Sequence, residues 1–195
     1  MPSALETTEQ ELLLRAQKND IEAFESLISP YTNQLLNHAF RILKNREDAE
    51  DALQDTYLKT YNSIKKFEGV SSFKTWLYKI LTNACLDKLR KQKRETTTSL
   101  YTTDEDGEHE INVADETYSP EISAQKSAAY AALKKALDTL SEEHRIAIIM
   151  RDIDGLTYDE IAEATETNVG TVKSRINRAR SQLKKILQKD RELFV

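Results

Sequence analysis

Glycine and proline are so scarce in this sequence that it is restricted almost entirely to helical folds. The 195 residues contain 4 Gly and 3 Pro, far fewer than the turns of a β-sandwich or barrel require. The hydrophobic share of 39% is enough for modest cores, while the charged share of 31% indicates a heavily solvated surface. The composition therefore predicts a folded, all-α chain, large enough for one ordinary domain or two small ones.

Apolar residues recur at helical spacing over most of the chain. In the first half they predict helical turns over 12–28, a helix that Ser29 caps and that has Pro30 in its first turn, and helices over 46–67 and 72–94. In the second half they predict helices over 128–140, 141–153, 157–164 and 168–188. Residues 95–122 lose this periodicity. We therefore expect two small helical domains, residues 8–94 and 123–191, joined by a flexible linker over 95–122.

Charge is distributed unevenly along the chain, although the net charge is only -5. The linker carries nine acidic residues and no Lys or Arg, whereas residues 59–94 hold ten bases against two acids and residues 173–191 hold eight bases against one acid. Nucleic-acid binding depends on the local field and not on the summed charge. Two basic segments that flank an acidic linker are therefore compatible with DNA binding, despite a pI near 5.4.

The second domain shows a helix-turn-helix pattern. Thr157 and Glu160 form a capping box at the start of a short helix, and Asn168 is placed to cap the next one. On that second helix an apolar stripe predicts a buried face, formed by Val172, Ile176, Ala179, Leu183 and Ile186. The opposite face carries donors suited to base edges in a major groove, namely Lys173, Ser174, Asn177 and Arg178, while Arg175, Arg180 and Lys184 could hold phosphates. The alternative is an ordinary solvated helix face.

The first domain places aromatic residues inside its basic segment: Tyr57, Tyr61, Phe67, Phe73, Trp76 and Tyr78. Exposed rings that alternate with bases suit single-stranded DNA, whose bases stack on aromatics, and the loop over 68–72 could receive a flipped base. The alternative is that most of these rings belong to the core, above all Tyr57 and Trp76, which lie on apolar helical stripes.

An acidic segment precedes these aromatics, with acids at positions 47, 48, 50, 51 and 55. Acids at the N-terminal end of a helix favour its dipole. A face that includes Asp51, Gln54 and Asp55 could equally dock onto a basic partner helix, and the residues alone leave both interpretations open.

Catalytic and metal-binding constellations are absent from the sequence pattern. Cys85 is the only cysteine, which argues for a reducing compartment and a small buried core residue, and His38, His109 and His144 have no ligand-like or triad-like companion nearby. We therefore expect no enzyme activity, no metal and no cofactor. Without a signal peptide or a run of 18 apolar residues, the chain is expected in the cytoplasm.

Three segments in this order resemble the bacterial extracytoplasmic function (ECF) sigma factors, which are promoter-specificity subunits of RNA polymerase. EDAEDALQDTYLKTY resembles their polymerase-binding segment, FEGVSSFKTWLYKILTNACLDKLRK the segment that melts and recognises the minus-10 element, and RDIDGLTYDEIAEATETNVGTVKSRINRAR the minus-35-reading helix-turn-helix. The resemblance covers nearly the whole chain.

The resemblance implies partners and sites. The partners would be core RNA polymerase, through its β′ clamp helices and β flap, promoter DNA, and an anti-sigma factor, with no small-molecule substrate. Polymerase would be bound by Asp51, Gln54 and Asp55. Melted minus-10 DNA would be bound by Phe67, Ser72, Phe73, Trp76, Lys79 and Asn83. Minus-35 duplex would be bound by Arg151, Lys173, Ser174, Asn177 and Arg178.

Two other function classes fit the residues less well. A helix-turn-helix regulator acting without polymerase would leave the aromatic and basic segment of the first domain without a use. A nuclease would need carboxylates focused on one point, whereas the acids at positions 47–55 are spread around a helix.

Overall fold

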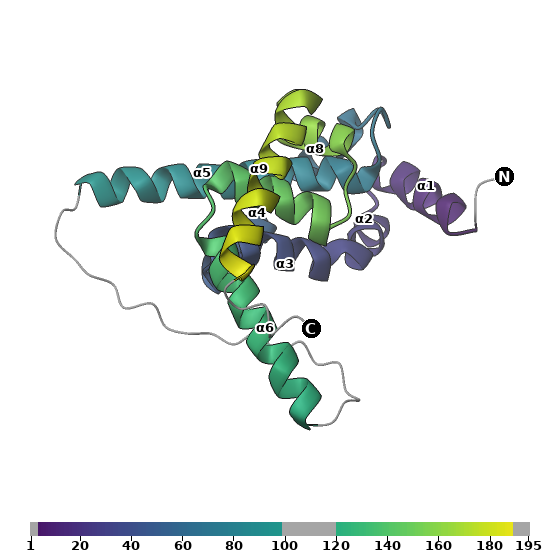
Figure 1. Cartoon of the computed structure of the whole chain (residues 1–195). Coiled ribbons are helices and arrows are strands. Elements are labelled where there is room, and N and C mark those ends of the chain that lie inside the picture. The colour runs from purple at the N-terminus through teal and green to yellow at the C-terminus, as the bar shows by residue number, and fades with distance from the viewer. Residues whose placement is uncertain (1–3, 99–119, 189–195) are drawn as a thin grey trace.

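The computed structural model describes residues 4–98 and 120–188, and within those ranges the only regular elements are helices (Figure 1). This confirms the all-α prediction. The first half contains α1 (Ala4–Ala16), α2 (Ile21–Ile28), the 3-10 turn η1 (Ser29–Tyr31), α3 (Thr32–Leu43), α4 (Arg46–Ser63), the 3-10 turn η2 (Ile64–Lys66) and α5 (Phe73–Thr98). The second half contains α6 (Pro120–Asp138), α7 (Glu142–Ile148), the π-helical turn η3 (Ile149–Ile153), α8 (Tyr158–Ala164) and α9 (Val169–Leu187).

Side-chain caps fix several helix starts. Oδ1 of Asp20, Asn45 and Asn168 accepts from the amide three residues on, at 3.0, 3.0 and 2.8 Å, so α2, α4 and α9 begin directly after these residues. At the other end of α3, Lys44 takes a left-handed conformation with φ 63°, and its amide donates a hydrogen bond to the Phe40 carbonyl. The short connection to Asn45 then turns the chain directly into α4.

Some expected boundaries were wrong. Ser29 and Pro30 begin the 3-10 turn η1 and not an α-helix, because the chain makes one tighter turn before α3 starts at Thr32. The helix expected over 46–67 ends at Ser63 and continues as η2. In the second half, α6 begins at Pro120, well before the expected residue 128. The helix α5 likewise continues past Arg94 to Thr98, and the middle of the expected linker, 99–119, lies outside the described residues.

The larger hydrophobic core is shared by both halves of the chain. Leu35 and Leu77 of the first half belong to the same buried cluster as Ile149, Met150 and Leu156 of the second. The helix α5 runs across the molecule and contacts α4 on one side and α8 on another (Figure 1). A smaller cluster closes the second half around α6 and α9, through Ala136, Leu140, Ile148, Ala179 and Leu183. The two predicted domains therefore pack against each other in this structure.

Candidate functional site

The outward face of α9 has the geometry expected of a DNA-reading helix. Val172, Ile176, Ala179 and Leu183 are buried, as the stripe predicted, and its last member, Ile186, is half-buried. The side chains on the other face are exposed, and they are Lys173, Ser174, Asn177 and Arg178. Since α8 packs against the buried side of α9, the pair presents this polar face outward as one unit.

The capping box that starts α8 is present. The Thr157 amide donates to Glu160 Oε2 at 2.7 Å, and the Glu160 amide donates to Thr157 Oγ1 at 3.2 Å. Burial would raise the pKa of Glu160, but hydrogen bonds from Thr157 and Thr75 outweigh it and hold that pKa below its ordinary value. Glu160 is therefore an ionised acceptor that fixes the entry to the helix-turn-helix.

Arg151 lies beside the α9 face but is anchored within the domain. Its Nη1 donates to the Leu156 carbonyl at 2.8 Å, and its guanidinium lies 4.9 Å from the centre of the Tyr158 ring. The Nζ of Lys173 approaches the same ring, 5.9 Å from its centre. Tyr158 thus gathers two of the five predicted minus-35 residues at one place.

Two bases suggested as phosphate contacts make ion pairs inside the second half. Arg175 Nη2 lies 2.9 Å from Glu143 Oε2, and Arg180 holds Asp152 with two bonds, at 3.0 and 2.6 Å. The bidentate pair between Arg180 and Asp152 ties α9 to η3. These contacts fix the orientation of α9, and local spacing could not reveal them because the acids come from other elements.

Three predicted minus-10 aromatics form one cluster at the start of α5. The ring of Phe67 lies 5.8 Å from that of Phe73 and 4.9 Å from that of Trp76. Phe73 is only 2% exposed, whereas Phe67 and Trp76 are half-buried. Gln17 of the loop after α1 donates to the Phe67 carbonyl at 3.0 Å and so holds this cluster's loop in place.

Of the polar residues predicted for the same DNA, Ser72 lies just before α5, and Lys79 and Asn83 lie further along the helix. Ser72 is exposed and its Oγ accepts from the Thr75 amide at 3.0 Å, while Lys79 and Asn83 are half-buried. Lys79 faces Glu166, with 3.7 Å between Nζ and Oε1. All six predicted minus-10 residues thus come from α5 or the loop before it, and α8 lies against this helix.

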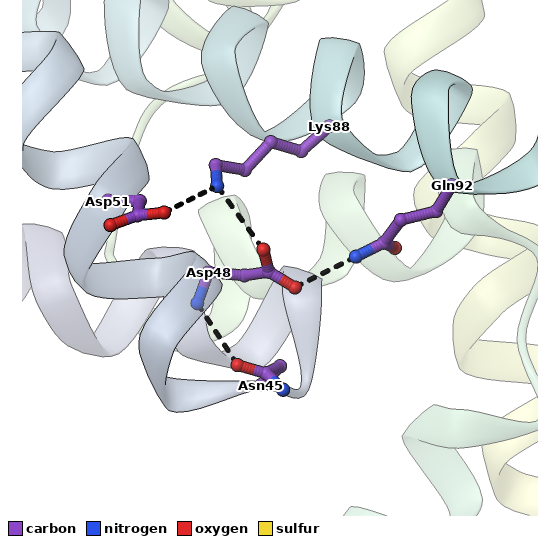
Figure 2. A network of polar contacts seen from close by, with 5 residues as sticks. All are labelled: Asn45, Asp48, Asp51, Lys88 and Gln92. Carbon is purple, nitrogen blue, oxygen red and sulfur yellow. Dashed lines mark hydrogen bonds and ion pairs between the residues drawn. The ribbon is translucent and has the colours of Figure 1, made fainter. Parts of the chain in front are cut away.

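The acidic face of α4 is exposed at Asp51, Gln54 and Asp55, as docking requires. Figure 2 shows how one edge of this face is tied down: Lys88 Nζ of α5 lies 3.2 Å from both Asp48 Oδ1 and Asp51 Oδ2. Burial lowers the pKa of Lys88, but these two carboxylates outweigh it, so the net pKa is raised and the cation is retained.

Gln92 extends this network along α5. Its Nε2 donates to Asp48 Oδ2 at 2.8 Å, and the Asp48 amide is in turn held by the α4 cap residue Asn45 (Figure 2). Both Asp48 oxygens are therefore used within the first half. Gln54 and Asp55 lie outside this network and are the parts of the acidic face most open to a partner.

One polar site was missed by sequence reasoning. His38 of α3 is fully buried, and its Nδ1 lies 2.7 Å from Oδ2 of Asp154, which follows η3 in the second half. The two residues are 116 positions apart, so no spacing pattern connects them. The only available signal was a histidine at an apolar helix position, which suggests a buried ring but names no partner.

The described part of the chain holds neither a metal-binding cluster nor a membrane-spanning helix. Residues 4–98 and 120–188 contain no group of three or more His, Cys, Asp or Glu side chains placed to hold a metal ion. None of the helices in these ranges is long and apolar enough to span a membrane.

Both halves of the chain match families of known proteins. Residues 27–95 match the family model of sigma-70 region 2, and residues 130–183 match that of sigma-70 region 4. The chain is 32% identical to the RNA polymerase sigma-H factor of Pseudomonas aeruginosa, over 92% of this chain and 94% of the relative. It is 34% identical to the ECF RNA polymerase sigma-E factor of Escherichia coli K12, over 90% of this chain and 92% of the relative.

Two solved structures of sigma factors are similar to this one. The sigma factor RpoE, crystallised with the anti-sigma factor NepR from Bartonella quintana, matches 85% of this chain with a TM-score of 0.69 and 29% identity. CnrH, solved with the cytosolic domain of CnrY, matches 94% with a TM-score of 0.67, and at 22% identity it supports the fold. The chain belongs to the sigma-70 family, as an RNA polymerase sigma factor of the ECF type.

Proposed function

We propose that this sigma factor directs core polymerase to promoters through separate surfaces on its two halves, and without catalysis of its own. The observation that carries the proposal is the exposed face of α9, where Lys173, Ser174 and Arg178 stand on a helix packed and capped like a major-groove reader. In this proposal α9 reads the minus-35 duplex.

The first half would supply the other two contacts. The exposed acids of α4 would dock onto the basic clamp helices of polymerase. The half-buried rings of Phe67 and Trp76, supported from below by the buried Phe73, would take the melted minus-10 strand together with Lys79 and Asn83. Residues 8–94 and 123–191 would act as the two binding domains and 95–122 as their tether, so that binding at one site raises the effective concentration at the other.

Transcription in vitro tests the function directly. Purified core RNA polymerase is supplied with a mixed library of bacterial promoter fragments, with and without this protein. Specific initiation that depends on the added chain is expected, and it would identify the promoter motif. If no initiation occurs while the protein alone binds a specific duplex tightly, a regulator that works without polymerase would replace this proposal.

Polymerase docking through α4 has its own test. Replacing Asp51 and Asp55 together by Lys should abolish association with core polymerase, since two attractive charges become repulsive ones on an exposed face. A matched control reverses Glu22 and Glu25, which are exposed on α2. Circular dichroism verifies that both variants keep their helices. Normal co-purification of the Asp51 and Asp55 variant with polymerase would refute the docking role.

The proposal includes an anti-sigma partner in the cytoplasm. It rests on the RpoE structure, which is 29% identical and was solved with the anti-sigma factor NepR. Affinity purification from cells should then return a further protein in addition to polymerase subunits. A purification that returns only polymerase subunits would count against this partner.

A further inference from the structure

Gln17 joins the turn after α1 to the chain that leads into the aromatic cluster. Its side-chain amide donates to the Ile64 carbonyl at 3.2 Å and to the Phe67 carbonyl at 3.0 Å, although these residues lie 47 and 50 positions away. An amide NH2 group has two hydrogens, so Gln17 can supply one to each carbonyl. The two bonds therefore hold both ends of residues 64–67, the ring segment.

The ring segment carries groups suited to a nucleic-acid strand. The side chains of Lys65 and Lys66 are exposed on η2, and Phe67 follows directly. The Phe67 ring lies 4.9 Å from the Trp76 ring, with 35° between the ring planes. Lysines can follow phosphates while neighbouring rings receive bases. The backbone that Gln17 holds thus sets the direction of these charges relative to the rings.

The loop after the ring segment is exposed. Gly69 takes a left-handed conformation with φ 73°, and Val70 is 90% exposed. The next fixed point is Ser72, whose Oγ accepts from the Thr75 amide at 3.0 Å at the start of α5. Exposed loops with few buried contacts open at low cost. Losing the attachment to Gln17 is therefore expected to free the Phe67 ring from Trp76.

Gln17 itself stands in a well-defined turn. Its amide donates to the Leu13 carbonyl at 2.9 Å, and Asn19 takes a left-handed conformation with φ 66°. Asp20 then caps α2 and accepts from Arg15 Nε at 2.9 Å. A side chain on a fixed backbone loses less conformational entropy when it forms its bonds. The turn therefore presents Gln17 to the ring segment in advance.

The helix α1 supports the same rings at a second point. Glu9 Oε2 accepts from the Tyr31 hydroxyl at 2.6 Å, and the Tyr31 ring lies edge-on to Phe73, 6.1 Å between the centres. Phe73 in turn packs under Phe67 and Trp76. Figure 1 shows α1 beside α2, on the side of the molecule where α5 begins. The first helix thus braces the aromatic cluster through its backbone and through its rings.

We propose that Gln17 is a positioning residue for single-stranded DNA, which holds the ring segment so that Phe67 and Trp76 face one strand. The same backbone directs Lys65 and Lys66 toward the phosphates of that strand. The inference rests on the proposed function of the aromatic cluster. A site that must be ordered before it binds has an apparent affinity reduced by the fraction of molecules that are ordered. Gln17 raises this fraction and leaves the duplex-reading face of α9 unaffected.

Paired substitutions separate this role from the effects of side-chain length and charge. Gln17→Met keeps the length of the side chain and removes both donors, whereas Gln17→Lys keeps a donor and adds a charge. The same two changes at Gln10, which is exposed on α1, are the matched controls. Circular dichroism and urea unfolding verify that all four variants are folded.

The position of the rings can be measured in the free full chain. Trp76 is its single tryptophan, so quenching by acrylamide reports on this indole alone. Gln17→Met should raise the quenching constant toward that of the urea-unfolded chain, because Phe67 no longer stays against Trp76. Gln17→Lys should show a smaller rise, and both Gln10 variants should match the unmodified chain.

Strand binding is measured with the full chain assembled on core RNA polymerase. The probe is a fluorescein-labelled mixed-sequence strand of about 12 nucleotides, and core polymerase alone gives the baseline. Gln17→Met should bind the strand at least about fivefold more weakly than Gln10→Met. Gln17→Lys should recover most of this loss when it is compared with Gln10→Lys. Binding of the free chain to the annealed duplex should differ by less than about twofold within each pair.

Several results would overturn the proposal. Unchanged quenching in Gln17→Met would show that Gln17 does not hold the rings, and raised quenching with unchanged strand binding would show that their position does not matter for the strand. Equal losses for strand and duplex, or no recovery in Gln17→Lys, would show that the donor has no specific role. If the unmodified chain adds no strand binding to core polymerase, the proposed function of the cluster fails instead, and that result appears before any substitution is made.

Discussion

Cys85 lies on the buried side of α5, within the larger core. Its side chain has no exposed surface, and burial raises the pKa of the thiol to about 12, with a smaller opposite effect from Lys88. The thiolate, which is the reactive species, is therefore almost absent near neutral pH. This agrees with the sequence-based expectation of a small core residue.

We expect this thiol to be unreactive in the native chain. Ellman's reagent at pH 8 should modify Cys85 only very slowly, and one thiol per chain should react at once after denaturation in guanidinium chloride. A rapid native reaction would mean that α5 opens readily or that Cys85 is not buried.

The α9 side chains carry a second prediction at this scale. Replacing Arg178 by Ala should reduce discrimination between the preferred minus-35 sequence and a mutated one by about 1–3 kcal/mol, if the side chain makes a bidentate contact to a base. Lys173→Ala should behave similarly, with part of its loss arising from the position beside Tyr158. Competition binding with the two duplexes measures this. Lys185→Ala is the control, since Lys185 is exposed in the last turn of α9. If all variants discriminated equally between the two duplexes, Arg178 would not be one of the residues that contact bases.

At the scale of the element, α8 depends on its capping box. The helix has only 7 residues, too few to be stable alone, so its start must be fixed by side chains and packing. Glu160 satisfies the Thr157 amide and also accepts from Thr75 of α5. One carboxylate therefore helps to start the helix-turn-helix and to hold the two halves together.

The lowered pKa of Glu160 predicts a pH dependence. A carboxyl whose pKa is lower in the folded state than its unfolded value of 4.5 adds stability that is fully present above that value and is lost as the pH falls through the folded pKa. Glu160→Gln should therefore be less stable than the unmodified chain at pH 7, and the difference should shrink as the pH falls below about 4.5. Urea unfolding at pH 7 and at pH 4 and below measures both free energies. A difference that stays constant with pH would contradict the ionised role of Glu160.

Local patterns predicted the elements better than they predicted how those elements meet. The capping box of Thr157 and the buried stripe of α9 are confirmed, because both arise from residues within a few positions of one another. The early start of α6 and the π-helical turn η3 were not foreseen, since helix starts and local widening depend on packing as well as propensity. The roles of the individual DNA-binding and polymerase-binding residues remain predictions.

At the scale of the whole molecule, the sequence left open whether the two halves pack together. The linker has no pattern that decides this, and the groups that join the halves look ordinary in isolation. From the sequence alone, His38 is interpreted as a buried histidine and Asp154 as an acid in the loop before Gly155. Their pairing exists only once α3 and η3 are in contact. The packing of the two halves thus depends on residues that lie more than a hundred positions apart. The spacing of residues along the sequence does not reveal such contacts.

The shared core predicts that the halves unfold together. Ile149 of η3 is fully buried in the cluster that also holds Leu35 and Leu77 of the first half. Ile149→Ala should destabilise the chain by about 2–5 kcal/mol through lost burial and a cavity. If the core is continuous, this loss must reach the first half, where Trp76 is the chain's single tryptophan. Unfolding by urea, followed by Trp76 fluorescence and by far-UV circular dichroism, should then shift to lower denaturant by the same amount with both probes.

Leu58→Ala serves as the control, because Leu58 is 64% exposed and its truncation should change stability by no more than about 0.5 kcal/mol. If the dichroism transition of Ile149→Ala moved while the Trp76 transition stayed in place, the halves would fold separately. Their contact would then be too weak to keep them packed together in solution.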